Sequence, residues 1–251
     1  YKHLWLDIRG VFLYYVKMKN QYFKYLKLPF EVERPDFENS IFELRYGKKE
    51  HDLKQNVGYI VKKKHLPVHK KVVNFVNTFD DITVFTVIYL QTGKNKIMTI
   101  HNDCPMIDNK TCADSVAINF SYGHSESRLQ YFNINDANNV YWITHNQTNT
   151  KDKDAFTLEQ GKIEDEPFRN ELVKHRFQSI EERYCDFVTE TKHDTKHPTL
   201  VNLGQFHRAY NVYNQNRYVI QYRLTHKNTY GTEVSFKEAS DLLKDYIIDL
   251  T

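Results

Sequence analysis

Apolar and polar residues alternate along much of the first two thirds of the chain, which is the pattern of half-buried β-strands. The segment 26–33 alternates without a break, so we expect a strand there. The β-branched runs 82–90 and 96–100 are joined by a short link that contains a glycine, which is a hairpin signal. The runs 116–122 and 128–134 repeat this arrangement. Consecutive antiparallel strands of this kind predict a meander that forms a sandwich or a barrel.

The spacing of the apolar residues changes near Gly161. Over 168–187 they fall three or four positions apart, which predicts an amphipathic helix of about six turns. A strand-like segment, 218–224, follows, and the Ser-Phe-Lys-Glu pattern at 235–238 is a capping box that begins a second helix. The pattern therefore predicts an α+β protein, with a predominantly antiparallel β-meander and two amphipathic helices in its C-terminal third.

These two patterns divide the chain into an antiparallel β-rich region, 1–161, and a helix-strand-helix region, 162–251. We expect the second region to pack on the first as one compact unit, because 251 residues with 40% hydrophobic content suffice for one large domain. No run approaches the 18 or more consecutive apolar residues of a membrane-spanning helix, so no transmembrane segment is predicted.

The composition is that of a globular protein, with 27% charged and 14% aromatic residues. The net charge is +3 and the basic residues are scattered, so no nucleic-acid partner is predicted. Lys, Asn, Tyr, Phe and Ile are abundant, which is the coding bias of AT-rich genomes such as those of many parasites and large DNA viruses. The sequence begins with Tyr1, and either removal of a signal peptide or a shortened sequence would explain the missing methionine.

No contiguous catalytic motif stands out. Gly123-His-Ser125 is similar to part of a nucleophile elbow, but residue 127 is not the required glycine, and the stretch lies in a predicted hairpin link. Asp7 lies two residues before Arg9 on a largely apolar strand, where an ion pair is the simplest interpretation. We therefore predict a protein that is not an enzyme, with no catalytic residue and no cofactor. An enzyme whose active-site residues are dispersed along the sequence stays an alternative.

Candidate metal ligands occur in three sets. They are His65 with His69, His193 with His197, and His101 with Asp103, Cys104 and Cys112. Twelve histidines produce such spacings by chance, and neither histidine pair has a matching second cluster. The two cysteines of the third set are eight residues apart, outside the short Cys-x2-4-Cys spacing of structural zinc sites. We predict no metal site.

Cys104 and Cys112 flank a polar loop that contains Pro105, and we predict a disulfide bond between them. Closing this loop would stabilise the fold by about 2–3 kcal/mol. In a reducing compartment both thiols would stay free, which is unusual in a polar loop because thiols are normally buried. The disulfide implies an oxidising compartment, so we expect a secreted or cell-surface protein. It leaves Cys185 as a free thiol or as an intermolecular bond in a dimer.

Three N-glycosylation sequons begin at Asn109, Asn119 and Asn146. Their number is close to what chance gives, so the number itself is no evidence. Asn109 lies in a link and Asn146 at a strand end, where a glycan is accommodated, whereas Asn119 lies in the middle of a predicted strand. A glycoprotein is the expectation if the protein is exported.

Together these observations favour a secreted or surface-exposed, β-rich binding protein that recognises another protein, such as a pathogen or parasite factor that acts on a host. Two alternatives stay open. A β-barrel carrier of an apolar small ligand would use the aromatic residues of 4–30 to line its cavity. An intracellular structural or viral assembly protein would form assemblies and carry no glycans.

Overall fold

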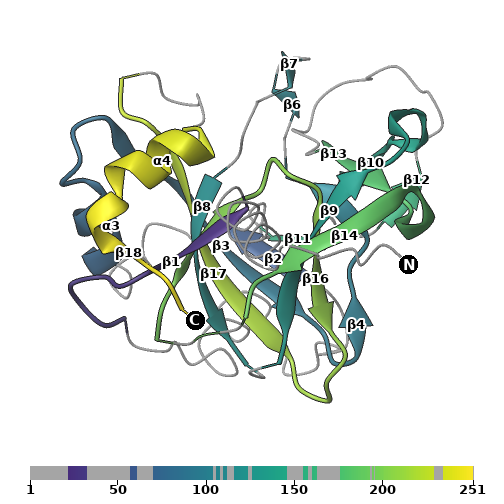
Figure 1. Ribbon diagram of the computed structural model, residues 1–251, viewed down its shortest axis with the longest axis horizontal. Helices are drawn as coiled ribbons and strands as arrows, with labels where there is room; N and C mark the ends of the chain where they lie inside the picture. The colour runs from purple at the N-terminus through teal and green to yellow at the C-terminus, as the bar shows by residue number, and fades with distance from the viewer. Residues whose placement is uncertain are drawn as a thin grey trace, which may run out of the picture.

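The computed structural model describes residues 22–32, 57–60, 70–103, 106–107, 110–111, 116–123, 126–145, 155–157, 160–162, 176–192, 194, 196–228 and 234–250. In this part of the chain, two antiparallel β-sheets that do not close into a barrel are accompanied by two short α-helices (Figure 1). No helix among these residues is both long and apolar enough to cross a membrane.

Each strand of the two sheets is antiparallel to its neighbours. The order in the first sheet is β11 (Ala155–Thr157), β2 (Val57–Ile60), β3 (Ile82–Thr92), β17 (Arg217–His226), β8 (Val116–Tyr122), β15 (Thr199–Asn202), β1 (Phe23–Leu26) and β18 (Ile247–Ile248). The order in the second sheet is β12 (Gln160–Lys162), β10 (Tyr141–His145), β13 (Arg176–Ile180), β5 (Ile100–Asn102), β16 (His207–Asn211), β9 (Arg128–Ile134) and β14 (Cys185–Glu190), with β4 (Lys96–Ile97) also paired to β16. A separate pair consists of β6 (Met106–Ile107) and β7 (Lys110–Thr111).

Neither predicted hairpin forms. β3 pairs with β2 and β17, whereas β4 and β5 belong to the second sheet. In the same way, β8 pairs with β15 and β17, and β9 pairs with β14 and β16. Each short link therefore carries the chain from one sheet to the other, so the predicted meander is wrong. Strands from both 1–161 and 162–251 alternate within each sheet, as β17 does between β3 and β8.

The helix predicted over 168–187 is wrong in its described part, 176–187. These residues form β13, the 3-10 helix η4 (Glu182–Tyr184) and the start of β14. Backbone groups of β13 pair with β10 and β5, and those of β14 pair with β9, so they are not available for helical hydrogen bonds. The prediction of two C-terminal amphipathic helices is therefore corrected to a mostly β fold.

The two α-helices of the described residues are short. α3 (Lys70–Val76) lies where no helix was predicted, and α4 (Phe236–Leu242) is the predicted C-terminal helix. The capping box of α4 is confirmed in its first half, because the Glu238 amide donates to Ser235 Oγ over 3.2 Å. Further 3-10 turns are η3 (Ala137–Asn139) and η5 (Lys244–Tyr246).

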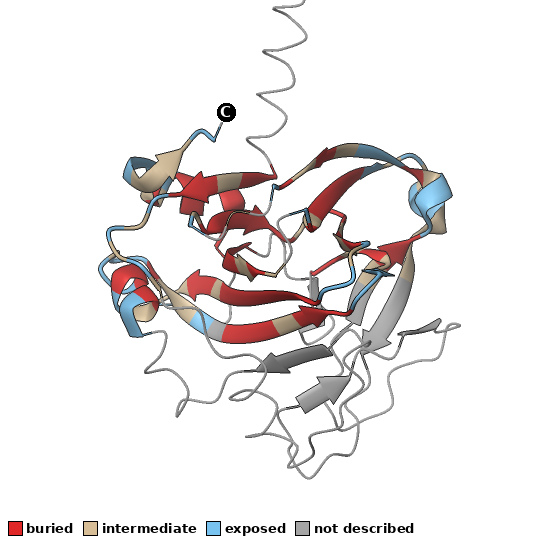
Figure 2. Ribbon diagram, turned by 90° about the horizontal axis from the view of Figure 1, so that it is seen from below, coloured by how far each residue is buried: buried red, intermediate tan, exposed pale blue. Residues whose placement is uncertain are grey.

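Alternate residues of β17 face opposite sides of the first sheet. Tyr218, Ile220 and Tyr222 belong to the apolar core that joins this sheet to α3 and α4. The alternating residues from Arg217 to Arg223 therefore face the second sheet. Figure 2 shows buried residues on the strands of both layers. The smaller core between the two sheets consists of Tyr22, Phe23, Tyr25, Ala117, Leu129, Tyr131, Val201 and Leu203.

Candidate metal centre

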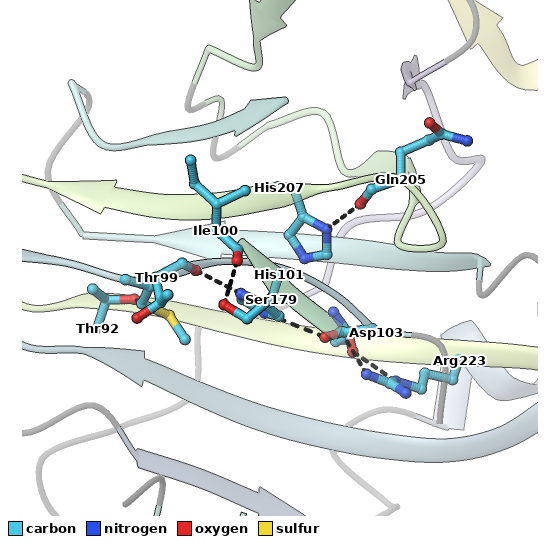
Figure 3. A network of polar contacts seen from close by, with 11 residues as sticks. Thr92, Thr99, Ile100, His101, Asp103, Ser179, Gln205, His207 and Arg223 are labelled. Atoms are coloured by element: carbon cyan, nitrogen blue, oxygen red, sulfur yellow. Dashed lines mark hydrogen bonds and ion pairs between the residues drawn. The ribbon is translucent and has the colours of Figure 1, made fainter. Parts of the chain in front are cut away.

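Two histidines and one aspartate meet where the second sheet faces β17 (Figure 3). His101 lies in β5 and Asp103 directly follows that strand, so their side chains point to the same side. His207 begins β16 and is the cross-strand partner of His101. Ligand atoms of all three side chains lie within 4.8 Å of one another. We call these three residues the cluster.

Each histidine of the cluster is oriented by a backbone carbonyl. His101 Nδ1 lies 2.8 Å from the carbonyl oxygen of Thr99, and His207 Nδ1 lies 2.8 Å from that of Gln205. A carbonyl oxygen only accepts hydrogen bonds, so Nδ1 carries the proton in both rings. The lone pair of each neutral ring is then on Nε2, which is the arrangement that holds metal-binding histidines in place.

Asp103 uses its two oxygens differently. Oδ2 accepts a hydrogen bond from Arg223 Nη2 over 2.6 Å, whereas Oδ1 lies 3.3 Å from His101 Nε2. Burial opposes ionisation of Asp103, but the Arg223 guanidinium, together with smaller contributions from His101 and His207, outweighs burial and holds the pKa of the carboxyl well below its usual range. Asp103 is therefore a carboxylate with one oxygen directed at the histidines.

The pKa values of the two histidines are shifted in opposite directions. Burial, followed by repulsion from His101, lowers the pKa of His207 to about 4, so this ring is neutral at neutral pH. Burial also disfavours the charged form of His101, but the hydrogen bond to Asp103, the charge of Asp103 and the contact with the Thr99 carbonyl together outweigh burial and raise the pKa of His101. A divalent cation bound between His101 Nε2 and Asp103 Oδ1 would take the place of a proton on Nε2.

The donor set fits a divalent transition metal. Two imidazole nitrogens and one carboxylate oxygen are borderline donors that suit iron, zinc, cobalt or nickel, and not the all-oxygen environment that calcium and magnesium prefer. All three residues are largely withdrawn from solvent, with Asp103 7% and His207 3% exposed. The side chains therefore form a pre-oriented donor set that fits a divalent cation.

Arg217 is a second unusual charge on the same face of β17 as Arg223. It is 5% exposed, and its Nε has no hydrogen-bond partner among the described residues. Burial lowers the pKa of Arg217 to about 10, and no described carboxylate offsets that burial. Burial of a cation without an anion beside it is costly.

Tyr131 connects Arg217 with the cluster. Its side chain is fully buried, and its ring centroid lies 6.0 Å from that of His207. Burial raises the pKa of Tyr131 well above its usual range, the Asp103 charge adds to this rise, and the Arg217 charge opposes it. Both charges are therefore within electrostatic reach of one hydroxyl group.

The cluster takes His101 and Asp103 from the third set of sequence candidates and joins them to His207, which sequence reasoning missed. The signal in the sequence is the His-x-Asp spacing at the end of a β-branched run. Arg217 and Arg223 were missed as well, because charged residues within a strand pattern are ordinarily solvated.

Three other candidates are described and lie outside the cluster. Cys185 is 9% exposed, and its Sγ donates to the Glu182 carbonyl over 3.3 Å. Asn119 is 5% exposed in the middle of β8, and His197 Nδ1 lies 2.7 Å from Asp194 Oδ2. The candidates outside the described residues are Asp7, His65, His69, Cys104, Asn109, Cys112, Ser125, Asn146 and His193.

Two of the solved structures that are similar to this chain are structures of HygX. No protein-family model and no curated protein matches the chain. HygX from Streptomyces hygroscopicus with nickel and 2-oxoglutarate bound is 11% identical, with 88% of each chain covered and a TM-score of 0.37. HygX with iron bound is 10% identical, with 88% of this chain and 87% of that chain covered and a TM-score of 0.33.

The prediction that the protein is not an enzyme is corrected. It rested on the absence of a contiguous motif, whereas catalytic residues here would come from separate strands. The cluster has the residue types of a catalytic metal site. Because both TM-scores are below 0.5, we base the function on the side chains of the cluster and not on this likeness.

Proposed function

We propose that the protein is a non-haem iron(II) oxygenase, with Fe2+ held by Nε2 of His101, Nε2 of His207 and Oδ1 of Asp103. The observation that carries this proposal is the cluster, in which both Nδ1 atoms are anchored at 2.8 Å to backbone carbonyls. Two histidines and one carboxylate on one face of an iron ion leave the opposite positions open. The bound iron would supply the activation of O2.

Arg217 supports a co-substrate that carries a carboxylate. The buried guanidinium has no described anionic partner, and a bound carboxylate would accept a hydrogen bond from its free Nε. The co-substrate class that we propose is a 2-oxo acid with a second carboxylate, whose oxo-acid end would bind the metal and whose far carboxylate would pair with Arg217. We take 2-oxoglutarate as the probe of this class.

The overall reaction balances with such a co-substrate. The 2-oxo acid loses CO2 and takes up one oxygen atom of O2 to become the shortened carboxylic acid, which supplies two electrons. The other oxygen atom enters a C–H bond of the substrate as a hydroxyl group. In this chain, His101, Asp103 and His207 would hold the metal, and Arg217 would orient the co-substrate.

The test is metal binding followed by turnover. Metal-free protein is titrated anaerobically with Fe2+, Co2+ and Zn2+, and the Fe2+ form is then given 2-oxoglutarate and O2 while CO2 release is measured. We expect Fe2+-dependent CO2 release by the wild-type protein, and His207→Ala to bind Fe2+ more than about tenfold more weakly. His197→Ala is the matched control, because His197 also pairs with an aspartate at 2.7 Å but lies outside the cluster.

Two results would decide against the proposal. If wild type and His207→Ala bind all three cations equally, the cluster is not a metal centre. If the wild-type protein binds Zn2+ through His207 but never releases CO2 with Fe2+, the metal centre stands and the oxygenase function is wrong, because zinc also uses two histidines and a carboxylate.

The sequence-based hypotheses on location and partners stay predictions beside this proposal. They comprise export, the Cys104–Cys112 disulfide, glycosylation, a protein partner and a dimer through Cys185. A carrier or assembly role also stays untested. A non-reduced peptide map reports on the cysteines and the sequons together.

A further inference from the structure

The carboxylate of Asp103 contacts both His101 and an arginine of the opposite sheet, Arg223. Arg223 Nη2 lies 2.6 Å from Oδ2, and the exposed fractions of the two side chains are 14% for Arg223 and 10% for Asp103. Figure 3 shows the carboxylate between His101 and the guanidinium. A charge-assisted hydrogen bond in a site this dry is among the stronger polar contacts of a protein.

Arg223 is itself held in position. Its Nε donates to Gln221 Oε1 over 2.9 Å, and both residues lie on β17 in the interior of the first sheet. Gln221 is 1% exposed and the side chain of Arg223 is 14% exposed, so both are largely enclosed by protein. The guanidinium therefore occupies one place and fixes the direction of the carboxylate that it contacts.

A carboxylate can bind a metal through one oxygen or through both. With Oδ2 committed to Arg223, only Oδ1 of Asp103 is available, and it already points at His101. Binding through both oxygens would occupy an additional coordination position that a co-substrate or O2 needs. The contact thus decides how many positions of the metal stay open.

We propose that Arg223, supported by Gln221, is a positioning residue that keeps Asp103 a one-oxygen ligand and so keeps the coordination positions for co-substrate and O2 open. This role rests on the proposed metal centre. It differs from simple charge neutralisation, because a lysine would supply the charge without the paired contacts to Gln221 and Asp103.

The experiment compares four forms of the full chain, each loaded with Co2+ for absorption spectra and with Fe2+ for nitric oxide titration. Nitric oxide is a neutral probe of open positions, so a change in local charge alters its binding little. The forms are wild type, Arg223→Met, Arg223→Lys and Gln221→Leu. Arg208→Met is the matched control, since Arg208 also contacts a glutamine at 2.9 Å and a carboxylate at 2.7 Å, but on the other face of β16.

We expect Arg223→Met to bind nitric oxide at least about tenfold more weakly and to change the Co2+ spectrum toward a different coordination number. Arg223→Lys should restore binding only in part, and Gln221→Leu should shift both readouts in the same direction by less. The control should match wild type in both. If Arg223→Met does not fold, the Co2+ spectrum and the nitric oxide affinity of Gln221→Leu test the inference in its place.

The inference is overturned if Arg223→Met, or Gln221→Leu in its place, keeps the wild-type spectrum and nitric oxide affinity. It is also overturned if Arg223→Lys restores both in full, since charge alone would then suffice. Failure of the proposed function is a separate result, because it is seen in the wild-type protein as metal binding that does not depend on His207.

Discussion

Replacing Arg217 with methionine removes a buried positive charge and leaves a side chain of similar length in its place. Burial lowers the pKa of Arg217 from its ordinary value to about 10, and at 1.36 kcal/mol per pKa unit this corresponds to a cost of about 3 kcal/mol for the charged form. We therefore expect Arg217→Met to raise the free energy of unfolding by about 1–3 kcal/mol when no ligand is bound.

Thermal unfolding of the metal-loaded protein measures this effect. For a chain of this size, each kcal/mol shifts the melting temperature by about 2–4 °C, so the variant should melt several degrees above wild type. Addition of 2-oxoglutarate at 100 times its Kd should stabilise wild type by about 2.7 kcal/mol. The variant should gain much less, so the difference between the two proteins should shrink or change sign with the ligand.

Arg208→Met is again the control for loss of an arginine. Its guanidinium bonds Glu182 at 2.7 and 2.9 Å, and that glutamate is largely exposed, so we expect an unchanged or lower melting temperature and no dependence on 2-oxoglutarate. A ligand-free Arg217→Met protein that melts below wild type would refute the reasoning, because Arg217 would then have a stabilising partner within the fold.

Two further predictions concern groups away from the cluster. Burial alone would raise the pKa of Asp194, but His197 and the Lys196 amide outweigh burial and lower this pKa. The contribution of the Asp194 carboxylate to folding stability is therefore complete above the ordinary carboxyl pKa and is lost as the pH falls through the lowered pKa. Asp194→Asn should make the denaturant midpoint fall less steeply between pH 5 and pH 3, and an unchanged fall would contradict this. Burial, with the charge of Glu182 adding to it, raises the pKa of the Cys185 thiol. Iodoacetamide at pH 8 should therefore alkylate Cys185 slowly in the folded protein and quickly in denaturant, which intact mass measurements follow. Equal rates would show that the thiol is accessible in the folded protein.

The sequence predicts where strands lie better than which strands pair. The runs at 82–90 and 116–122 do form β3 and β8, because alternation reports that a segment has one buried face. The alternation of apolar and polar residues is the same whether the next strand joins the same sheet or the facing sheet. After β3 and after β8, the next strand joins the facing sheet. Over 176–187, apolar residues three or four apart imitate a helix because two short strands meet at η4, where the period of two is interrupted.

Only part of the candidate metal centre can be predicted from the sequence. His101 and Asp103 are neighbours in the chain, and they were considered as ligands with the nearby cysteines. Their actual companion, His207, is selected by the pairing of β16 with β5, and that pairing is long-range information. The carbonyls of Thr99 and Gln205 that anchor the two rings belong to the backbone, which every residue has, so the sequence does not mark them. Only the fold shows that both histidines direct Nε2 toward the cluster.

Charge balance across the two sheets narrows the class of co-substrate. Asp103 and Arg223 cancel one another, both histidines would be neutral as metal ligands, and Arg217 stays uncompensated among the described residues. A bound dication therefore adds its charge to a buried region that is already positive, where low dielectric strengthens every interaction. In the proposed function, the two negative charges of a dicarboxylate would offset the excess charge at the metal and at Arg217, whereas a neutral or singly charged molecule would leave one of them buried and unpaired. On the proposed function, a dicarboxylate oxo acid should therefore bind more tightly than a monocarboxylate, and its binding should be coupled to that of the metal.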